Sequence, residues 1–279
     1  MAIEGRSVLV ATDLSARSDR AVDRAQFLAQ SWGVRLKVTH VVEPGSWLAH
    51  NPDRVREAVK AILPDPAADV DIVVPDGPAP KAIVRVADQL NCGLIVTGVA
   101  RFNHAGDFVV GTAVDHMVRT AHAPVLVVKQ RPRGMYKTLL VATDFSSCSR
   151  HALLTAANMF PEAVILVVHA DNSPFDVWLK SDDAAEFCTP RGQEDLDAFL
   201  DEPTIPQDVR DRIIPRSAVG IVSAVIDDLA RESGADLVVI GTHGRSGFVR
   251  KVVGSMAESI LFWVQPDTLM VREWPDSAE

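Results

Sequence analysis

A glycine-rich stretch in the second half of the chain has the composition of a phosphate-binding loop. It reads GTHGRSGFVRKVVGS, so two residues separate Gly241 from Gly244 and nine separate Gly244 from Gly254. Glycines let the backbone turn tightly and approach a ligand without a Cβ atom. A helix beginning at Ser255 would add unpaired N–H groups and the positive end of its dipole. Together these features predict an anion cradle.

The charge of this stretch favours the same ligand. Arg245, Arg250 and Lys251 add positive charge, and the stretch contains no acidic residue. It is neither a Walker loop, because Gly-Lys-Ser/Thr is missing, nor a GxGxxG fingerprint. Two simpler explanations stay open. The three cations could form a solvated loop face, and Ser255 with Glu258 forms an S-x-x-E capping box that needs no ligand.

The chain also repeats itself. Residues 7–20 read SVLVATDLSARSDR, and residues 137–150 read KTLLVATDFSSCSR. Three further pairs follow in the same order: VTHVV with VVHAD, CGLIVTG with ADLVVIG, and APVLVVK with PDTLMVR. A fixed internal order of this kind indicates a duplicated domain. We therefore predict a first copy over residues 1–130 and a second copy over residues 137–279, joined by the polar linker QRPRGMY.

Each copy alternates short apolar runs, typical of buried parallel strands, with segments of helical periodicity. This pattern predicts an α/β fold of two tandem doubly wound, five-stranded parallel-sheet domains, Rossmann-like and suited to nucleotides. For the first copy we predict strands at 8–12, 36–42, 70–74, 94–97 and 125–129 and helices at 19–32, 52–63, 80–90 and 112–121. For the second copy we predict strands at 138–143, 164–169, 209–215, 237–240 and 268–272 and helices at 149–160, 221–232 and 255–264, with 176–200 unassigned.

Sheets of this kind bind ligands at the carboxyl ends of their strands, where the strand order reverses. Asp13 and Asp144 follow the first strand of their copies, where they could bind a ligand or cap the turn into the next helix. The first copy keeps Gly98 and the pair Gly111-Thr112, but Arg101 stands where the second copy has Gly244. A long side chain there would block the approach of backbone to phosphate. We therefore expect triphosphate binding in the second copy only.

With its VATDFS opening and its Gly-x2-Gly-x9-Gly-Ser spacing, the sequence resembles the tandem-domain members of the universal stress protein family over essentially the whole chain. The second copy matches the spacing that marks the family's ATP-binding branch at every fixed position. The resemblance implies a regulatory protein of the stress response that binds ATP, with Mg²⁺ as a companion ion, and is not an enzyme.

The same resemblance implies which residues would hold the nucleotide. Asp144 would accept from the ribose hydroxyls or help to hold Mg²⁺, and the backbone of Ala170, just after the second strand, would meet the adenine edge. Gly241 and His243 would lie on one side of the phosphates and Met256 on the other. The complete set is Ala142, Thr143, Asp144, Ala170, Gly241, His243, Gly244, Arg245, Gly254, Ser255 and Met256.

Composition sets limits on other functions. The net charge of −9 argues against a nucleic-acid binder. Three scattered cysteines and the absence of a long apolar run predict a cytoplasmic protein that neither crosses nor binds a membrane. The spacing of the histidines favours no metal site. His40 and His169 end matching strands, which suggests a shared structural role, and we interpret Cys148 as a buried bystander.

The second copy carries extra residues between its second and third strands, with Trp178, Phe187 and Phe199 among them. Packing is the default interpretation of these aromatics. A lipophilic-ligand or chaperone-like binding module that uses this insertion is the alternative function, and a slow ATPase is another. The last strands, VLVVK and LMVR, are apolar enough to predict that they pair, which would make the two copies an intramolecular pseudo-dimer. We also expect an unknown protein partner.

Overall fold

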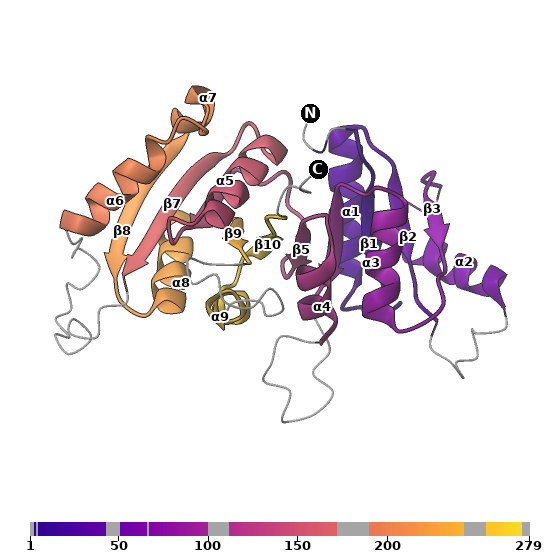
Figure 1. Cartoon of the computed structure of the whole chain (residues 1–279). Helices are drawn as coiled ribbons and strands as arrows, with labels where there is room; N and C mark the ends of the chain where they lie inside the picture. The colour runs from indigo at the N-terminus through magenta and orange to yellow at the C-terminus, as the bar shows by residue number, and fades with distance from the viewer. Residues whose placement is uncertain are drawn as a thin grey trace, which may run out of the picture. The chain divides into compact units, whose positions relative to one another are not determined.

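Figure 1 shows the computed structural model of the chain, which describes residues 3, 5–42, 51–65, 67–99, 112–171, 190–242 and 255–274. The chain folds as two compact units, Met1–Met135 and Tyr136–Glu279, which contain the first and the second copy. Each unit is described by itself, and the pairing expected between the two last strands stays a prediction.

The first unit is a parallel sheet flanked by helices. Its strands pair in the order β3-β2-β1-β4-β5, so the chain moves outward from β1 to β3 and then returns to the other side of β1. This reversal between β1 and β4 is the switch point at which such sheets bind ligands. The elements are β1 (Val8–Ala11), α1 (Asp19–Trp32), β2 (Leu36–Thr39), α2 (Pro52–Ala61), β3 (Asp71–Val73), α3 (Ala79–Gln89), β4 (Leu94–Gly98), α4 (Thr112–Thr120) and β5 (Val125–Val128).

The second unit repeats the same topology. Its strands pair in parallel in the order β8-β7-β6-β9-β10, which matches the first unit strand for strand. The predicted α/β class with two five-stranded parallel sheets is therefore confirmed. The elements are β6 (Thr138–Ala142), α5 (Ser147–Met159), β7 (Val164–Asp171), α6 (Pro190–Leu200), α7 (Gln207–Arg210), β8 (Ile213–Val219), α8 (Val222–Ser233), β9 (Leu237–Gly241), α9 (Ser255–Trp263) and β10 (Asp267–Val271).

The prediction was wrong at the third strand of the second unit. We expected a strand over 209–215, whereas α7 occupies Gln207–Arg210 and β8 runs from Ile213 to Val219. Pro206 precedes α7 with φ −63°, and Asp208 stands in the first turn, where an acidic residue favours a helix. Within the unassigned stretch, α6 covers Pro190–Leu200, while 172–189 lie outside the described residues.

The central strands form the core of each unit. Val8, Leu9 and Val10 of β1 are fully buried, as are Leu139, Leu140 and Val141 of β6. Helix α5 packs on β6, β9 and β10, and α6 packs on the neighbouring strands β7 and β8. Burial on both sides explains why these strands read as continuous apolar runs rather than as alternating ones.

The first helix of each unit ends in a different way. Helix α1 ends at Gly33, which adopts the left-handed conformation at φ 65° and bonds back to the last turn. The end of α5 is closed by Arg212, whose guanidinium donates to the carbonyl oxygens of Ala157 (3.3 Å), Phe160 (3.1 Å) and Ala163 (2.9 Å). The end of α1 is thus closed by its own neighbours, whereas the end of α5 adds the distant Arg212 to its local backbone bonds.

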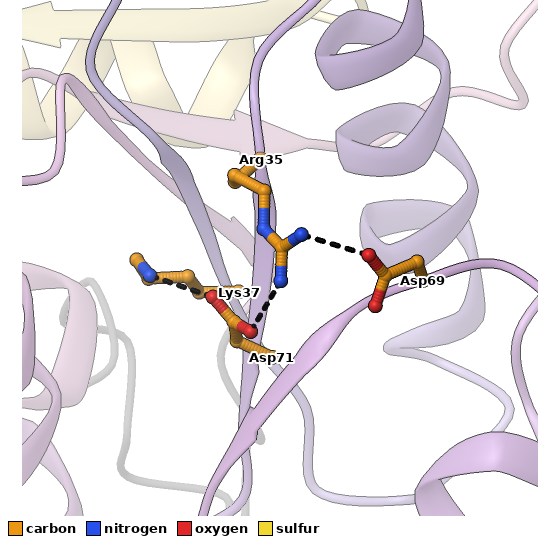
Figure 2. Close-up of polar contacts among 4 residues, drawn as sticks. All are labelled: Arg35, Lys37, Asp69 and Asp71. Atoms are coloured by element: carbon orange, nitrogen blue, oxygen red, sulfur yellow. Dashed lines mark hydrogen bonds and ion pairs between the residues drawn. The ribbon is translucent and has the colours of Figure 1, made fainter.

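The edge of the first sheet carries a group of ion pairs (Figure 2). Arg35 contacts Asp69 at 2.8 Å and Asp71 at 2.7 Å, and Lys37 contacts the other oxygen of Asp71 at 2.8 Å. The hydrogen bonds from Lys37 and Arg35 lower the pKa of Asp71. β3 is only three residues long and begins with the charged Asp71. A short strand and a charged residue both discourage an edge strand from pairing with another chain.

Candidate functional site

The chain leaves β6 through a turn held together by four polar side chains. The Thr143 hydroxyl accepts from the N–H of Phe145 at 2.9 Å and lies 2.9 Å from the hydroxyl of Ser149. Oδ1 of Asp144 accepts from the N–H of Ser146 at 3.1 Å and from its hydroxyl at 2.5 Å. The hydroxyl of Ser146 in turn accepts from the N–H of Ser149 and caps α5. Asp144 therefore serves the turn, as the capping interpretation predicts.

The first copy has the same turn after β1. Thr12 accepts from the N–H of Leu14 at 3.0 Å and lies 2.9 Å from the hydroxyl of Ser18. Asp13 accepts from the N–H of Ser15 at 3.0 Å and from its hydroxyl at 2.6 Å. Capping by Asp13 is thus also observed. The two strand ends share the threonine and aspartate contacts, whereas the side-chain cap that Ser146 gives α5 has no counterpart at the start of α1.

The residue after each aspartate is in the left-handed region. Leu14 has φ 60° and Phe145 has φ 64°. A side chain in this region costs about 1–3 kcal/mol, so surrounding contacts must hold it there. Backbone of this kind is often found at binding sites, where it directs neighbouring groups toward a ligand.

The two histidines flagged in the sequence have one structural role. Nδ1 of His169 lies 2.9 Å from the backbone oxygen of Thr143, and Nδ1 of His40 lies 2.9 Å from that of Thr12. Each bond joins the end of the second strand to the end of the first. The shared role expected for His40 and His169 is confirmed.

Gly241 ends β9 against the first turn of α5. A Cβ atom at this position would lie 3.1 Å from the carbonyl carbon, the carbonyl oxygen and Sγ of Cys148. Gly98 ends β4 in the same way, where a Cβ atom would lie 3.2 Å from the backbone oxygen of Arg17. These contacts require glycine for strand–helix packing, whatever ligand the site holds.

The remaining residues of the predicted site lie at the same edge of the second sheet or outside the described residues. Ala142 ends β6, and Thr143 is buried. Ala170 lies inside β7, opposite Ala218 of β8, and not after the strand as expected. His243, Gly244, Arg245 and Gly254 lie outside the described residues, as does the side chain of Ser255.

Helix α9 begins at Ser255, and Met256 in its first turn is 43% exposed. Because α9 connects the parallel strands β9 and β10, its N-terminus must lie at the carboxyl edge of the sheet. The turn at Asp144 lies at this edge too. A helix N-terminus and a strand-end carboxylate at one edge suit an anionic, hydroxyl-bearing ligand.

An aromatic cluster distinguishes the second copy. The ring of Phe145 stacks on His169, with centroids 4.1 Å apart, and contacts Phe199 of α6 at 5.8 Å. Arg150 of α5 lies over the ring of Phe199 at 5.7 Å. Phe199 is therefore a packing residue, as expected by default, while Trp178 and Phe187 lie outside the described residues.

Sequence reasoning missed Ser18, Ser146 and Ser149 as parts of the site. The signal was present, because Thr-Asp-x-Ser occurs at residues 12–15 and again at 143–146, each followed by a serine three residues later. A repeat of polar residues at matched strand ends points to a conserved local network within the chain rather than to chance spacing.

Other chemistry finds little support in the part of the chain that the structure describes. No three His, Cys, Asp or Glu side chains there come together as a metal site. Cys92 and Cys148 are buried free thiols, and burial raises the pKa of Cys92 to about 11. Sγ of Cys148 lies 3.7 Å from the carbonyl oxygen of Val271, which confirms its interpretation as a buried bystander. None of the described helices is long and apolar enough to cross a bilayer.

Comparisons with known proteins agree with the internal repeat. The family model described as "Universal stress protein family" matches the chain twice, over residues 5–129 and 135–272. A universal stress protein of Mycobacterium tuberculosis is 25% identical over 296 residues, which cover 95% of this chain and 97% of that protein. A universal stress protein of Methanocaldococcus jannaschii is 28% identical over 147 residues, covering 50% of this chain and 84% of the relative.

Solved structures share the whole fold. A universal stress protein from Archaeoglobus fulgidus is similar with a TM-score of 0.70 at 16% identity, covering 98% of both chains. A protein of unknown function from Pseudomonas aeruginosa is similar with a TM-score of 0.67 at 19% identity, covering 97% of this chain and 94% of the other. With two matches of the family model and the duplicated topology, this chain belongs to the universal stress protein family as a tandem, two-domain member.

Proposed function

We propose that this protein is a regulator of the stress response that binds one ATP, with Mg²⁺, in its second copy. The observation that supports the proposal is the topology of the second sheet, in which the Thr143–Ser149 turn and the N-terminus of α9 are both at the carboxyl edge, where the strand order reverses. The glycine-rich sequence from Gly241 to Gly254 connects β9 to that helix. In this proposal the turn holds the nucleoside, and the loop with the start of α9 holds the phosphates.

The set of residues proposed to bind is the one that the family resemblance implies. Asp144 is half-buried and belongs to the turn. Its carboxylate would accept from the ribose hydroxyls, while the backbone at Ala142 and Ala170 would face adenine. Mg²⁺, when bound, would neutralise phosphate charge. Gly244, Arg245 and Ser255 are assigned to the phosphates by sequence alone.

The asymmetry between the copies depends on the loops. The threonine and aspartate hydrogen bonds are the same in the two strand-end turns, so these bonds give no reason for unequal affinity. The loop of the second copy has three cations and no acid, whereas that of the first has Arg101 balanced by Asp107. Each charge-assisted hydrogen bond to phosphate contributes about 1.5–3 kcal/mol, and about 1.4 kcal/mol is a factor of ten in affinity. Losing two such contacts would weaken binding by several powers of ten.

Calorimetric titration with ATP and Mg²⁺ tests the proposal. The expected stoichiometry is one nucleotide per chain. Ser255→Asp should abolish binding, because it places a negative charge at the start of α9, and the matched variant Thr112→Asp should leave binding unchanged. A stoichiometry of two would show that both copies bind ATP. Binding that is lost only with Thr112→Asp would show that the site is in the first copy. Either result would contradict the proposal.

Two further measurements separate the alternative functions. A purified protein that retains no nucleotide and binds no ATP, yet binds an apolar ligand, would favour a lipophilic-ligand or chaperone-like module. Phosphate release during incubation with ATP would identify a slow ATPase. We expect neither, because the proposed role is regulation through nucleotide occupancy rather than catalysis.

A further inference from the structure

The two strand-end turns differ at the residue that adopts the left-handed conformation. The residue that follows the aspartate is Leu14 in the first copy and Phe145 in the second. Both are held in the left-handed region, but only the second can make aromatic contacts. Phe145 lies between His169 of β7, at 4.1 Å, and Phe199 of α6, at 5.8 Å between ring centroids. The turn of the second copy is therefore in contact with α6, which belongs to the extra residues between β7 and β8.

The end of α6 that carries Phe199 is held by burial and by contacts with α5 and α7. Phe199 is 5% exposed, and Leu196, one turn earlier, is fully buried. Arg150 of α5 lies over the Phe199 ring and reaches Glu202 at 3.4 Å. Arg210 of α7 donates to the backbone oxygens of Glu202 at 2.7 Å and of Asp201 at 3.1 Å, which closes the C-terminal end of α6. Movement of α6 would therefore be transmitted to Phe145.

We propose that Phe199 is a positioning residue for the second copy, through which α6 keeps the Asp144–Ser146 turn in its binding form. The matching hydrogen bonds hold both Leu14 and Phe145 in the left-handed region, and Phe199 adds a further contact that fixes the ring of Phe145. This inference rests on the proposed nucleotide site and describes how α6 would regulate its affinity. Displacement of α6, for example by a partner protein, lowers the affinity of the second copy and leaves the turn of the first copy unchanged.

Such coupling is reciprocal. If the packing of α6 favours nucleotide binding, then bound nucleotide must stabilise the packing of α6 by the same factor. Both directions can be measured separately. A purely structural Phe199 would lower the stability of the whole second copy without linking these two events.

The first test needs no ligand. Hydrogen exchange is measured for the N–H groups of Phe145 and Ser146, which donate to Thr143 at 2.9 Å and to Asp144 at 3.1 Å. Phe199→Leu keeps an apolar side chain but removes the ring, and Phe199→Tyr keeps the ring. An aromatic contact corresponds to a factor of about three to ten, so Phe199→Leu should speed exchange at both groups by about that factor.

Leu14 and Ser15 provide the internal control, because their N–H groups make the matching bonds in the same sample. Their exchange should be unchanged, as should exchange at Phe145 in Val55→Ala, which shortens a buried side chain of α2 in the first copy. Exchange at Phe145 that Phe199→Leu leaves unchanged, or that rises equally throughout the second copy, overturns the inference.

The second test uses ATP with Mg²⁺. Phe199→Leu should weaken binding by about three- to tenfold, Phe199→Tyr should restore it, and ATP should slow exchange at the N–H of Phe199 in the parent. If the parent binds no ATP, the proposed function fails while the ligand-free test still decides on the positioning role. If the parent binds ATP and Phe199→Leu binds equally well, the positioning role fails and the nucleotide site stands.

Discussion

The imidazole Nδ1 of His169 lies 2.9 Å from the backbone oxygen of Thr143, and this bond joins the ends of β7 and β6. A carbonyl oxygen can only accept, so Nδ1 must carry the proton. The same argument applies to His40 and Thr12. In the neutral form of each ring, the proton therefore lies on Nδ1 and Nε2 is an acceptor.

We predict that His40 and His169 share the Nδ1–H tautomer. The two-bond ¹⁵N–¹H correlations of the imidazole rings distinguish the tautomers directly. His122 lies on the surface and is a comparison in which Nδ1 lies 3.1 Å from a carboxylate oxygen of Asp88. Finding Nδ1 of either His40 or His169 without a proton would contradict the hydrogen bonds described.

Gly241→Ala should destabilise the second copy even without nucleotide. The added Cβ would lie 3.1 Å from backbone atoms of Cys148, which cannot move as a flexible side chain would. Overpacking of this kind costs about 1–3 kcal/mol. Thermal unfolding of the ligand-free protein measures the effect.

Two further variants serve as comparisons for the measured stability of Gly241→Ala. Gly98→Ala should destabilise the first copy for the same reason, since its Cβ would lie 3.2 Å from the backbone oxygen of Arg17. Val99→Ala, at a neighbouring side chain that is 46% exposed, should change stability by less than about 0.5 kcal/mol. Unfolding temperatures equal to the parent's for both glycine variants would show that the packing is not tight.

Tyr136→Phe should lower the stability of the second copy by about 1–3 kcal/mol. The Tyr136 hydroxyl donates to Oδ2 of Asp267 at 2.6 Å, and Asp267 is fully buried. The phenylalanine ring keeps the edge contact with Phe160 at 5.2 Å, so the change reports the hydroxyl alone. Urea unfolding followed in the second copy gives the value. An unchanged midpoint and slope would mean that the bond adds nothing.

Asp71→Asn should remove a pH-dependent part of the stability of the first copy. Bonds from Lys37 and Arg35 lower the pKa of Asp71 below its ordinary value of 3.8. A lowered carboxyl pKa stabilises the fold above the unfolded pKa, and this contribution is lost as the pH falls through the folded pKa. The parent should therefore exceed the variant in stability at neutral pH, with a difference that shrinks below about pH 4. The partners are partly exposed, so the difference should be small and should fall with added salt. A difference that grows on acidification would reverse the sign.

Gly244→Arg should abolish ATP binding without unfolding the protein. The variant gives the second copy the residue that the first copy has at Arg101. It inserts a long side chain where the proposed site needs backbone to touch phosphate. Calorimetry measures binding, and an unchanged thermal melt shows that the fold is intact. Affinity equal to the parent's would remove this loop from the site.

Much of the fold could be predicted because the signals were local. The helix predicted at 19–32 agrees with α1 (Asp19–Trp32), since its apolar spacing and its closing glycine are written in consecutive residues. β8 was misplaced because Val209, Ile213 and Ile214 read as one apolar run. Pro206 and Asp208 start a helix within that run, and only contacts with the rest of the unit decide where the strand begins.

The site was harder to predict because its contacts join distant residues. His169 and Thr143 are 26 residues apart, and nothing in either segment names the other as its partner. Gly241 was assigned to phosphate from its spacing, while its packing against Cys148 becomes visible only when β9 is next to α5. The link between Phe145 and Phe199 crosses the insertion, where no repeat in the first copy could serve as a guide.

The closing of α5 by Arg212 has a consequence for synthesis on the ribosome. Helix α1 finds its terminal partners within Ala29–Val34, so it can be completed soon after it leaves the exit tunnel. The end of α5 makes local backbone bonds as well, but its side-chain bonds come from Arg212, which is translated after the whole insertion. At elongation rates of about 5–20 residues per second, this delay lasts a few seconds. During that time the end of α5 in the nascent second copy would lack the three hydrogen bonds from Arg212.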